Sequence, residues 1–406
     1  MTGSKFISDR LFSLSKDQLS STVMRLAVTS VALAITVMLI SLAVVVGFKN
    51  QIRAKVVGFV APIHIQVLDR NESVEEAPFV VDERLEKAFK KPGIVRYQRV
   101  ANKAGIIKTD EEIQGVVMKG VDESYDWSYF KGCVVEGEVP QYHAGERSDQ
   151  VLISKNISDK MLLSVGDPVR VWFIDEDMQA RGRKFNIVGV FETGLTEFDE
   201  RYVFCDLNQI RKLNHWEDDA SGLVEVWIDD VDRMEEINQS LYFSIPSTLA
   251  SYTAKESNPQ IFDWLALLDT NVWLILALMF LVAGITVISM LLIIIIEKTS
   301  TIGLLKAMGA SNRFVRQVFL YRSIRILLVG MLIGNLVGLG FCALQYFTGF
   351  IHLNPETYYL SAVPIEIHLG TVVLLNVGTF VLWMLMLLIP TNIINRIRPS
   401  RSIRFE

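Results

Sequence analysis

The side chains that most often carry out catalysis are scattered along this chain. Its histidines and cysteines show no spacing typical of a metal site, or of a nucleophile with its base. They are His64, His143, His215, His352, His368, Cys133, Cys205 and Cys342. No GxxxxGKS/T phosphate loop and no HExxH pair is present. We therefore expect no enzyme activity and no metal or cofactor, and we interpret the acidic clusters at 175–177 and 217–219 as solvated turns.

One stretch, residues 297–311 (EKTSTIGLLKAMGAS), has a spacing that suits binding rather than catalysis. Ser300 or Thr301 can cap a short helix, and Gly309 can end it. Ile302, Leu305 and Met308 recur on one helical face, with Leu304 beside it. The stretch directly follows an apolar run. Such a helix can dock into a groove of a partner protein or lie on lipid, and the pattern favours neither.

Four long uncharged apolar runs must position this stretch. They cover residues 26–48, 270–296, 326–350 and 369–395. Each reaches the roughly 20 residues that a helix needs to span a bilayer. The first run continues well past a possible signal-peptide cleavage site at 32–34, so we expect a retained anchor. With 50% hydrophobic and 21% charged residues, the composition excludes a disordered chain, and the net charge of −5 excludes a basic nucleic-acid binder.

The flanks of these runs predict the orientation. Residues 1–25 hold four Lys and Arg residues, 297–325 hold six and the tail 396–406 holds four, whereas the loop 351–368 holds none. Basic flanks stay in the cytoplasm, so we expect both termini inside, and residues 49–269 and 351–368 outside. Residues 49–269 contain 26 basic and 39 acidic residues, a net charge of −13.

The segment 49–269 is large enough to form its own core. Period-two alternation predicts strands at 63–68, 113–118, 169–173, 185–191 and 223–228. Helical patterns cover 82–90, 154–163, 207–213 and 231–241, with Ser154 and Asp206 as N-caps. We expect a membrane α-helical protein of four transmembrane helices, with a large extracytoplasmic α+β domain of two small lobes between the first and second spans. Cys133 and Cys205 lie in that domain, and the sequence leaves open whether they pair.

The 297–311 stretch resembles the ERTREIGILKALGAS signature of FtsX-like and MacB-like permeases, the type VII ABC transporters. Residues 166–169 and 185–194 (FNIVGVFETG) are similar to the GDxV and FxVxGxFETG motifs of that family's external domain. Gly47-Phe48 and the end of the chain from Pro390 resemble the lipoprotein-releasing LolC/LolE branch, which typically ends in RxxPxxxLRYE. The resemblance covers essentially the whole chain.

This resemblance implies a permease of the inner membrane that extracts lipoproteins and passes them to a periplasmic chaperone. ATP and Mg²⁺ would bind a separate cytoplasmic ATPase, and a second permease subunit would complete a homodimer or heterodimer. The coupling helix that contacts the ATPase would comprise Thr301, Ile302, Gly303, Leu304, Leu305, Lys306, Met308 and Gly309. The family's chaperone-binding hook would fall in Ile174–Lys184, which is short here and lacks proline. Whether this chain recruits the chaperone or grips the substrate stays open.

Two further groups of residues are predicted sites within the spans. A cavity for the lipid chains is expected at the outer ends of the first two spans, lined by Val44, Val45, Phe48, Leu265, Leu268 and Trp273. Gly330, Gly334 and Gly338 form a small-residue stripe that allows close helix packing. Two alternative functions remain: activation of an external cell-wall hydrolase, as in FtsX-like permeases, and export of peptides or drugs, as in MacB-like ones.

Overall fold

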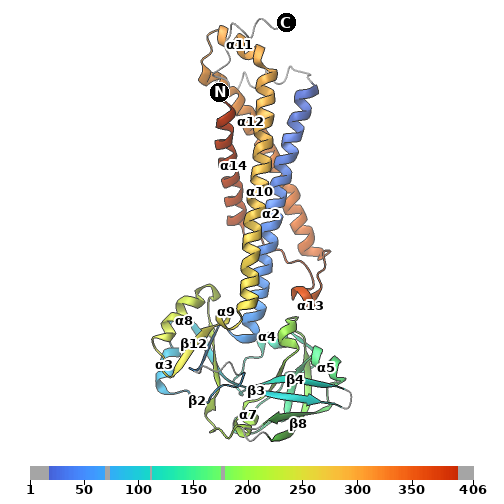
Figure 1. The fold of residues 1–406 in the computed structure, drawn as a ribbon, viewed down its shortest axis with the longest axis vertical. Coiled ribbons are helices and arrows are strands. Elements are labelled where there is room, and N and C mark those ends of the chain that lie inside the picture. The colour runs from blue at the N-terminus through green and yellow to red at the C-terminus, as the bar shows by residue number, and fades with distance from the viewer. Residues whose placement is uncertain (1–17, 69–73, 110–111, 175–178, 392–406) are drawn as a thin grey trace. The chain divides into compact units, whose positions relative to one another are not determined.

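The computed structural model describes residues 18–68, 74–109, 112–174 and 179–391, and these form two compact units. The helical unit comprises residues 18–50, 265–352 and 362–391, and the sheet unit comprises residues 51–264 and 353–361. Two long helices, α2 (Gln18–Val60) and α10 (Pro259–Glu297), contribute residues to both units (Figure 1).

The helical unit contains four helices that are long and apolar enough to cross a membrane. They are α2, α10, α12 (Asn312–Thr348) and α14 (Leu369–Thr391), and the shorter α11 (Thr299–Ala307) lies between α10 and α12. Helices suit this environment because a bilayer offers no partner for unpaired backbone groups. The predicted fold class, four membrane helices with an α+β domain inserted after the first, is confirmed.

Two of these helices run well beyond the uncharged stretches. α2 continues past residue 48 to Val60, and α10 begins at Pro259, before residue 270. The charges that interrupt the two runs neutralise each other, because Lys49 Nζ lies 2.6 Å from Asp269 Oδ2. The membrane limits themselves, 26–48 and 270–296, stay predictions.

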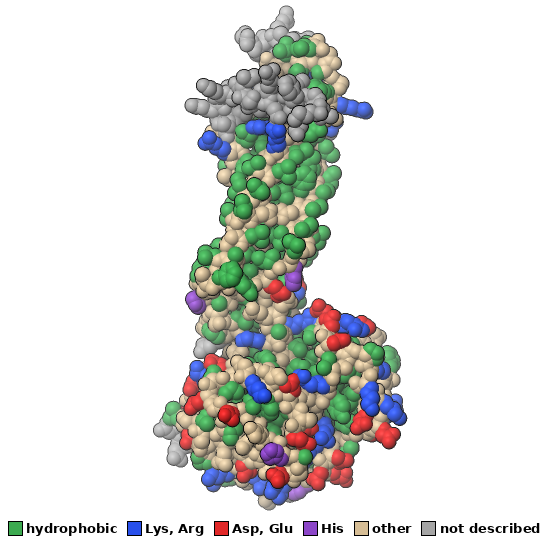
Figure 2. Space-filling view, turned by 180° about the vertical axis from the view of Figure 1, so that it is seen from behind, with side chains coloured by type: hydrophobic (Ala, Val, Ile, Leu, Met, Phe, Trp, Pro, Cys, Tyr) green, Lys and Arg blue, Asp and Glu red, His purple; other side chains and the backbone are tan. Residues whose placement is uncertain are grey.

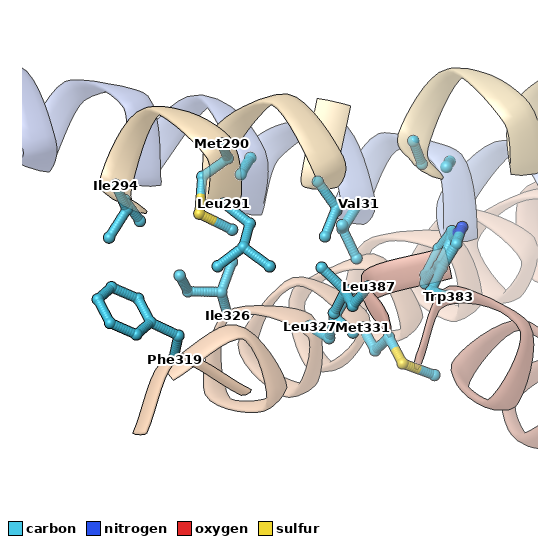
Figure 3. Close-up of a cluster of buried hydrophobic side chains, with 14 of the residues drawn as sticks. Val31, Met290, Leu291, Ile294, Phe319, Ile326, Leu327, Met331, Trp383 and Leu387 are labelled. Atoms are coloured by element: carbon cyan, nitrogen blue, oxygen red, sulfur yellow. The ribbon is translucent and has the colours of Figure 1, made fainter. Parts of the chain in front are cut away.

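Side chains from all four long helices meet in one buried cluster (Figure 3). Val31 comes from α2, Leu291 from α10, Leu327 from α12 and Trp383 from α14. The indole Nε1 of Trp383 donates to Phe280 O at 3.2 Å, so this bulky ring has its polar atom satisfied. In lipid such packing, rather than hydrophobic exclusion, holds helices together. On the face that Figure 2 shows, many hydrophobic side chains are exposed along the helices.

The sheet unit is built on one continuous ten-stranded sheet in the order β12-β1-β11-β3-β4-β9-β6-β8-β5, with β7 pairing β3 and β8. The bounds are β1 (Ile63–Val67), β3 (Ile94–Lys108), β4 (Ile113–Val121), β5 (Val134–Gly137), β6 (Gln150–Ser154), β7 (Pro168–Ile174), β8 (Ala180–Phe191), β9 (Tyr202–Asp206), β11 (Leu223–Ile228) and β12 (Leu249–Thr253). A separate pair joins β2 (Phe79–Val80) to β10 (Ala220–Ser221).

Six strands of this sheet close into a ring, because β7 pairs with both β8 and β3. The ring runs β3-β4-β9-β6-β8-β7 and encloses a core that includes Met118, Val171, Phe185 and Val203. Strand β3 leaves the ring at Val100, and its first half pairs with β11 instead. The ring and its extension therefore share strand β3 in one compact unit, and the expected division into two lobes stays a prediction.

Short helices complete the sheet unit. They are α3 (Glu83–Phe89), α4 (Ser128–Lys131), α5 (Lys155–Met161), α6 (Thr196–Asp199), α7 (Leu207–Leu213), the 3₁₀ turn η1 (Val231–Arg233), α8 (Met234–Tyr242), α9 (Ala254–Ser257) and α13 (Pro355–Tyr358). Ser154 Oγ accepts from Ile157 N at 3.1 Å and Asp206 Oδ1 from Asn208 N at 2.9 Å, which confirms both predicted N-caps. The five predicted strands and four predicted helices of this domain are all present.

Candidate functional site

Helix α11 forms the predicted coupling segment and is separated from its neighbours by two sharp turns. At its end, Gly309 has φ +92°, Gly309 N donates to Lys306 O and Ala310 N to Leu305 O, both at 3.0 Å. This is the glycine helix stop that the sequence predicted. Ser311 Oγ then accepts from Phe314 N at 3.3 Å and starts α12.

The predicted cap at the start of α11 is wrong. The helix begins after Lys298, and neither Ser300 nor Thr301 acts as an N-cap. Thr299 Oγ1 instead donates to Ile295 O at 3.0 Å and to Ile296 O at 2.7 Å, on the last turn of α10. The break between α10 and α11 therefore falls at Lys298, two or three residues earlier than expected.

The apolar side chains of α11 divide between two faces. Ile302 is 1% exposed in the core of the helical unit, and Leu305 packs against the same core. Leu304 is 55% exposed and Met308 77% exposed, one helical turn apart. Ile302, Leu305 and Met308 therefore do not form one free face, and the exposed apolar side chains are those of Leu304 and Met308. Gly303 is buried, whereas Thr301 and Lys306 are half-buried.

The glycine stripe of α12 lies against α2. A Cβ at Gly330 would come within 2.7 Å of Val31 Cγ1, and one at Gly334 within 2.6 Å of Ala32 O. Thr36 Oγ1 donates to the carbonyl oxygen of Gly334 at 3.1 Å. At Gly338 the nearest atom would be Leu39 Cδ1 at 3.3 Å. Only residues without a side chain let the two backbones approach this closely.

The six residues predicted for the lipid cavity lie in different surroundings. Phe48 and Leu265 are buried, Val44, Val45 and Leu268 are half-buried, and Trp273 is 72% exposed. A cavity of about 20 Å³ in the helical unit is lined by other residues of α2, α12 and α14 and of the segment 366–368, among them Leu39 and Cys342. The six residues are not gathered around it, and their role stays a prediction.

The last turns of α2 are fixed inside the sheet unit. Phe59 is fully buried, with ring centroids of Phe198, Tyr202, Phe130, Phe204 and Phe191 at 4.7, 5.2, 5.5, 5.8 and 6.4 Å. Lys119 Nζ donates to the carbonyl oxygen of Phe59 at 3.0 Å and to Glu225 Oε1 at 2.7 Å. A buried lysine thus satisfies a carbonyl at the end of α2, and the buried Glu225 balances its charge.

Two further cations fasten the same turns of α2. Arg53 pairs with the carboxylate of Asp232 and donates to the Val231 carbonyl oxygen at 2.5 Å. Lys55 Nζ donates to the carbonyl oxygens of Thr193 at 2.6 Å and Tyr359 at 2.9 Å. Tyr359 belongs to the loop between α12 and α14. The sequence analysis did not identify these contacts, because isolated Lys and Arg side chains are usually solvated.

Within the described residues, the remaining reactive side chains form no site. No group of three or more His, Cys, Asp or Glu is placed to hold a metal there, and the three cysteines are free thiols. His64 is buried, its ring bonds the Val60 carbonyl oxygen, and burial and then Lys119 lower the pKa of His64 to about 3. Burial also raises the pKa of Cys205 and, less strongly, of Cys133. Neither thiol is therefore activated as a nucleophile.

The expected hook segment 174–184 falls on the hairpin of β7 and β8. Ile174 pairs with Ala180 at its last described rung. Residues 175–178, which include one of the acidic clusters, lie outside the described residues.

Comparison with known proteins decides the family. Residues 25–241 match the model of the MacB-like periplasmic core domain, and residues 273–399 match the FtsX-like permease C-terminal model. The chain belongs to this family of permeases. Together the two models take in the first helix, most of the sheet unit, and the helices from α10 onward.

Full-length relatives carry names from lipoprotein release. The chain is 23% identical over 402 residues to the lipoprotein-releasing system transmembrane protein LolC of Xylella fastidiosa, covering 94% of this chain and 93% of the relative. It is 19% identical to LolE of Haemophilus influenzae, with 95% of each chain covered. An uncharacterized ABC transporter permease of Bacillus subtilis, YknZ, is 27% identical over 46% of this chain and 48% of its own length.

Solved structures of extracytoplasmic domains also match. The periplasmic region of MacB from Actinobacillus actinomycetemcomitans is 11% identical, with a TM-score of 0.34, and covers 52% of this chain and 97% of its own. The extracellular domain of YknZ from Gram-positive bacteria is 15% identical, with a TM-score of 0.33, and covers 47% of this chain and 99% of its own.

Proposed function

We propose that this permease extracts lipoproteins from the outer leaflet of the inner membrane and passes them to a periplasmic chaperone. The observation that carries the proposal is the match to LolC and LolE over 94% and 95% of the chain, spans and external domain included. The energy comes from a separate cytoplasmic ATPase, which binds ATP and Mg²⁺. A second permease subunit, identical or related, completes the transporter. Both termini and α11 face the cytoplasm, and the sheet unit faces the periplasm.

The chemistry of the substrate explains why a permease is needed. Moving an acyl chain into water costs about 0.8 kcal/mol per methylene, so three chains with about 40 methylenes cost on the order of 30 kcal/mol. One ATP cannot supply this amount. The chains must pass between apolar surfaces without meeting water, and the outer ends of α2 and α10, with Val44, Phe48 and Leu268, are the proposed start of that path.

The ATPase docks on α11 through the exposed pair Leu304 and Met308. An apolar pair one turn apart on a short helix that Gly309 ends fits a groove in a partner. Ile302 and Leu305, on the opposite face, tie α11 to the core of the helical unit. Movement of the ATPase can thereby reach α10 and α12 through packed side chains.

Depletion of the protein tests the substrate. We expect mature triacylated lipoproteins to accumulate in the inner membrane, measured by membrane fractionation and immunoblotting. Normal sorting of lipoproteins, together with a defect in cell separation or in drug or peptide export, would exclude lipoprotein release.

Substitution on α11 tests the docking. Leu304→Asp is expected to abolish co-purification of the ATPase, because a carboxylate in an apolar groove loses its hydration. The control is Ile113→Asp in β4, whose side chain is 62% exposed. It is expected to retain the ATPase. Full co-purification and normal lipoprotein sorting with Leu304→Asp would contradict the docking role.

A further inference from the structure

A polar cleft of about 620 Å³ in the sheet unit collects basic side chains in an otherwise acidic segment. Arg99 reaches it from β3, Arg147 from the loop before β6, and Arg211 and Lys212 from α7. By contrast, residues 49–269 as a whole carry a net charge of −13. A local excess of positive charge against that background indicates an anionic ligand.

Carboxylates compensate part of this charge, and a small positive excess remains. Glu123 and Asp218 line the cleft with the four basic side chains. Asp122 is buried behind it and accepts from Arg99 Nε at 3.0 Å, so Arg99 already has a partner. The other three cations converge on the cleft from two separate segments.

Arg211 shows the clearest sign of a missing partner. The residue is only 6% exposed, its Nε donates to Ala220 O at 2.8 Å, and its Nη1 donates to Asn208 Oδ1 at 2.9 Å. Its Nη2 is buried and has no acceptor among the described residues. Burial, and next the charge of Arg99, lower the pKa of Arg211. A buried guanidinium whose Nη2 has no acceptor for its N–H groups is costly, and an anion in the cleft would relieve that cost.

The loop that carries Arg147 is held in place by α7. Ser148 N donates to Asp206 Oδ2 at 2.8 Å, and Gln209 Nε2 donates to Ser148 O at 3.0 Å. On the other side of Arg147, Asn208 Nδ2 donates to Glu146 O at 3.2 Å. Because both neighbours of Arg147 are fixed, the backbone that carries this exposed side chain is held at the edge of the cleft.

We propose that this cleft binds the phosphoryl group of a small anionic ligand through Arg211 Nη2, Arg147 and Lys212. A phosphoryl group presents several acceptor oxygens and up to two charges, which suits three converging cations, whereas a carboxylate is satisfied by one guanidinium. The volume fits a small molecule, and Trp216 in the cleft wall offers a ring for its organic part. This site is separate from lipoprotein extraction and does not depend on it.

The test measures binding to the full-length protein in phosphatidylcholine nanodiscs at constant ionic strength. Inorganic phosphate and glycerol 3-phosphate are titrated by calorimetry, and we expect saturable binding with a Kd of about 1 mM or tighter for at least one of them. Arg147→Gln and Lys212→Gln should each weaken it about tenfold. Arg201→Gln, an exposed arginine of the same unit outside the cleft, is the matched control and should bind as the unaltered protein does.

A competition experiment identifies the source of the phosphoryl group, and a conservative substitution separates loss of binding from misfolding. If nanodiscs with added phosphatidylglycerol compete with glycerol 3-phosphate, the ligand is a lipid headgroup; if they do not, it is a free metabolite. Arg211→Lys keeps the charge but loses the guanidinium fork, and should also weaken binding about tenfold; because it loses the bond from Nε to Ala220 O as well, its melting temperature is measured alongside and binding is compared where the protein is folded. Absence of saturable binding up to about 10 mM, or equal affinity in Arg147→Gln and Arg201→Gln, would overturn the proposal. Citrate is titrated as a carboxylate control. Binding of citrate without binding of either phosphate compound would likewise overturn the proposal.

Discussion

Single buried polar residues decide how α2 ends in the sheet unit. The side chain of Lys119 is 4% exposed and that of Glu225 is 2% exposed, and the ammonium lies 5.4 Å from the centroid of the Phe59 ring. A lysine there satisfies a backbone carbonyl that the end of the helix would otherwise leave open. The same contact makes the last turn of α2 and the core of the sheet unit depend on one ammonium group.

Removing that ammonium should therefore destabilise the folded protein strongly. Lys119→Met leaves the Glu225 carboxylate buried without its cation, and we expect the free energy of unfolding to fall by about 3–5 kcal/mol. The double variant Lys119→Met with Glu225→Leu should recover much of the loss, because no buried charge remains. Denaturant unfolding of the three proteins gives the measurement. Equal stability of Lys119→Met and the unaltered protein would show that the pair is solvated.

His64 predicts a pH dependence of stability. Its folded pKa of about 3 lies below the ordinary value of 6.5, so the unfolded chain binds a proton that the folded chain does not. Stability should be unaffected above pH 6.5 and fall as the pH drops below it, by about 2 kcal/mol from pH 7 to pH 5. Glu76, whose pKa burial raises to about 7, acts in the opposite direction in the same range.

The variant His64→Gln separates the two groups, because Glu76 is common to both proteins. Denaturant midpoints at pH 7 and pH 5 should show the loss attributable to His64 only in the protein that has the histidine. Identical pH dependence of the two proteins would mean that the ring protonates in the folded state.

At the scale of elements, the apolar runs and the alternating strands were readable from the sequence. Ser154, Asp206 and Gly309 mark helix ends through their own local chemistry, and the structure has them there. Strands β6 and β9 were missed because short, fully buried segments such as Gln150–Ser154 and Tyr202–Asp206 show no alternation. β3 was missed because Lys103 interrupts its apolar pattern. The structure buries this lysine through an ion pair with Glu75, 28 residues away. Ion pairs between residues so far apart in sequence, such as Lys49 with Asp269, are determined by the tertiary fold and leave no local pattern in the sequence.

The contact of α2 with α12 can be tested with two glycines of one helix. A Cβ at Gly334 would lie 2.6 Å from the backbone oxygen of Ala32, whereas one at Gly340 has nothing within 4 Å. Gly334→Ala should force the helices apart and lower stability by about 1–3 kcal/mol. Gly340→Ala should be neutral or slightly stabilising, because alanine favours helix. Melting temperatures in nanodiscs provide the comparison, and equal effects of the two substitutions would contradict close packing at the stripe.

At the scale of the whole molecule, the distribution of charged residues predicts which side of the membrane each segment faces. The segments 1–25, 297–325 and 396–406 carry fourteen basic residues, whereas 49–269 has a net charge of −13. Basic flanks resist translocation, so α11 and the sheet unit should face opposite sides of the membrane. Everything proposed for the ATPase and for the lipoprotein depends on this, because each must reach its own surface.

Cysteine labelling in intact spheroplasts tests the sidedness directly. The three native cysteines are replaced, and Ser300→Cys next to the docking pair is compared with Ser124→Cys in the sheet unit; both serines are exposed. A membrane-impermeant maleimide should label position 124 in intact cells and position 300 only after lysis, because the bilayer separates them. Labelling of position 300 from outside would place α11 away from the cytoplasm. No cytoplasmic ATPase could then reach Leu304 and Met308, and a transporter driven through α11 would be excluded.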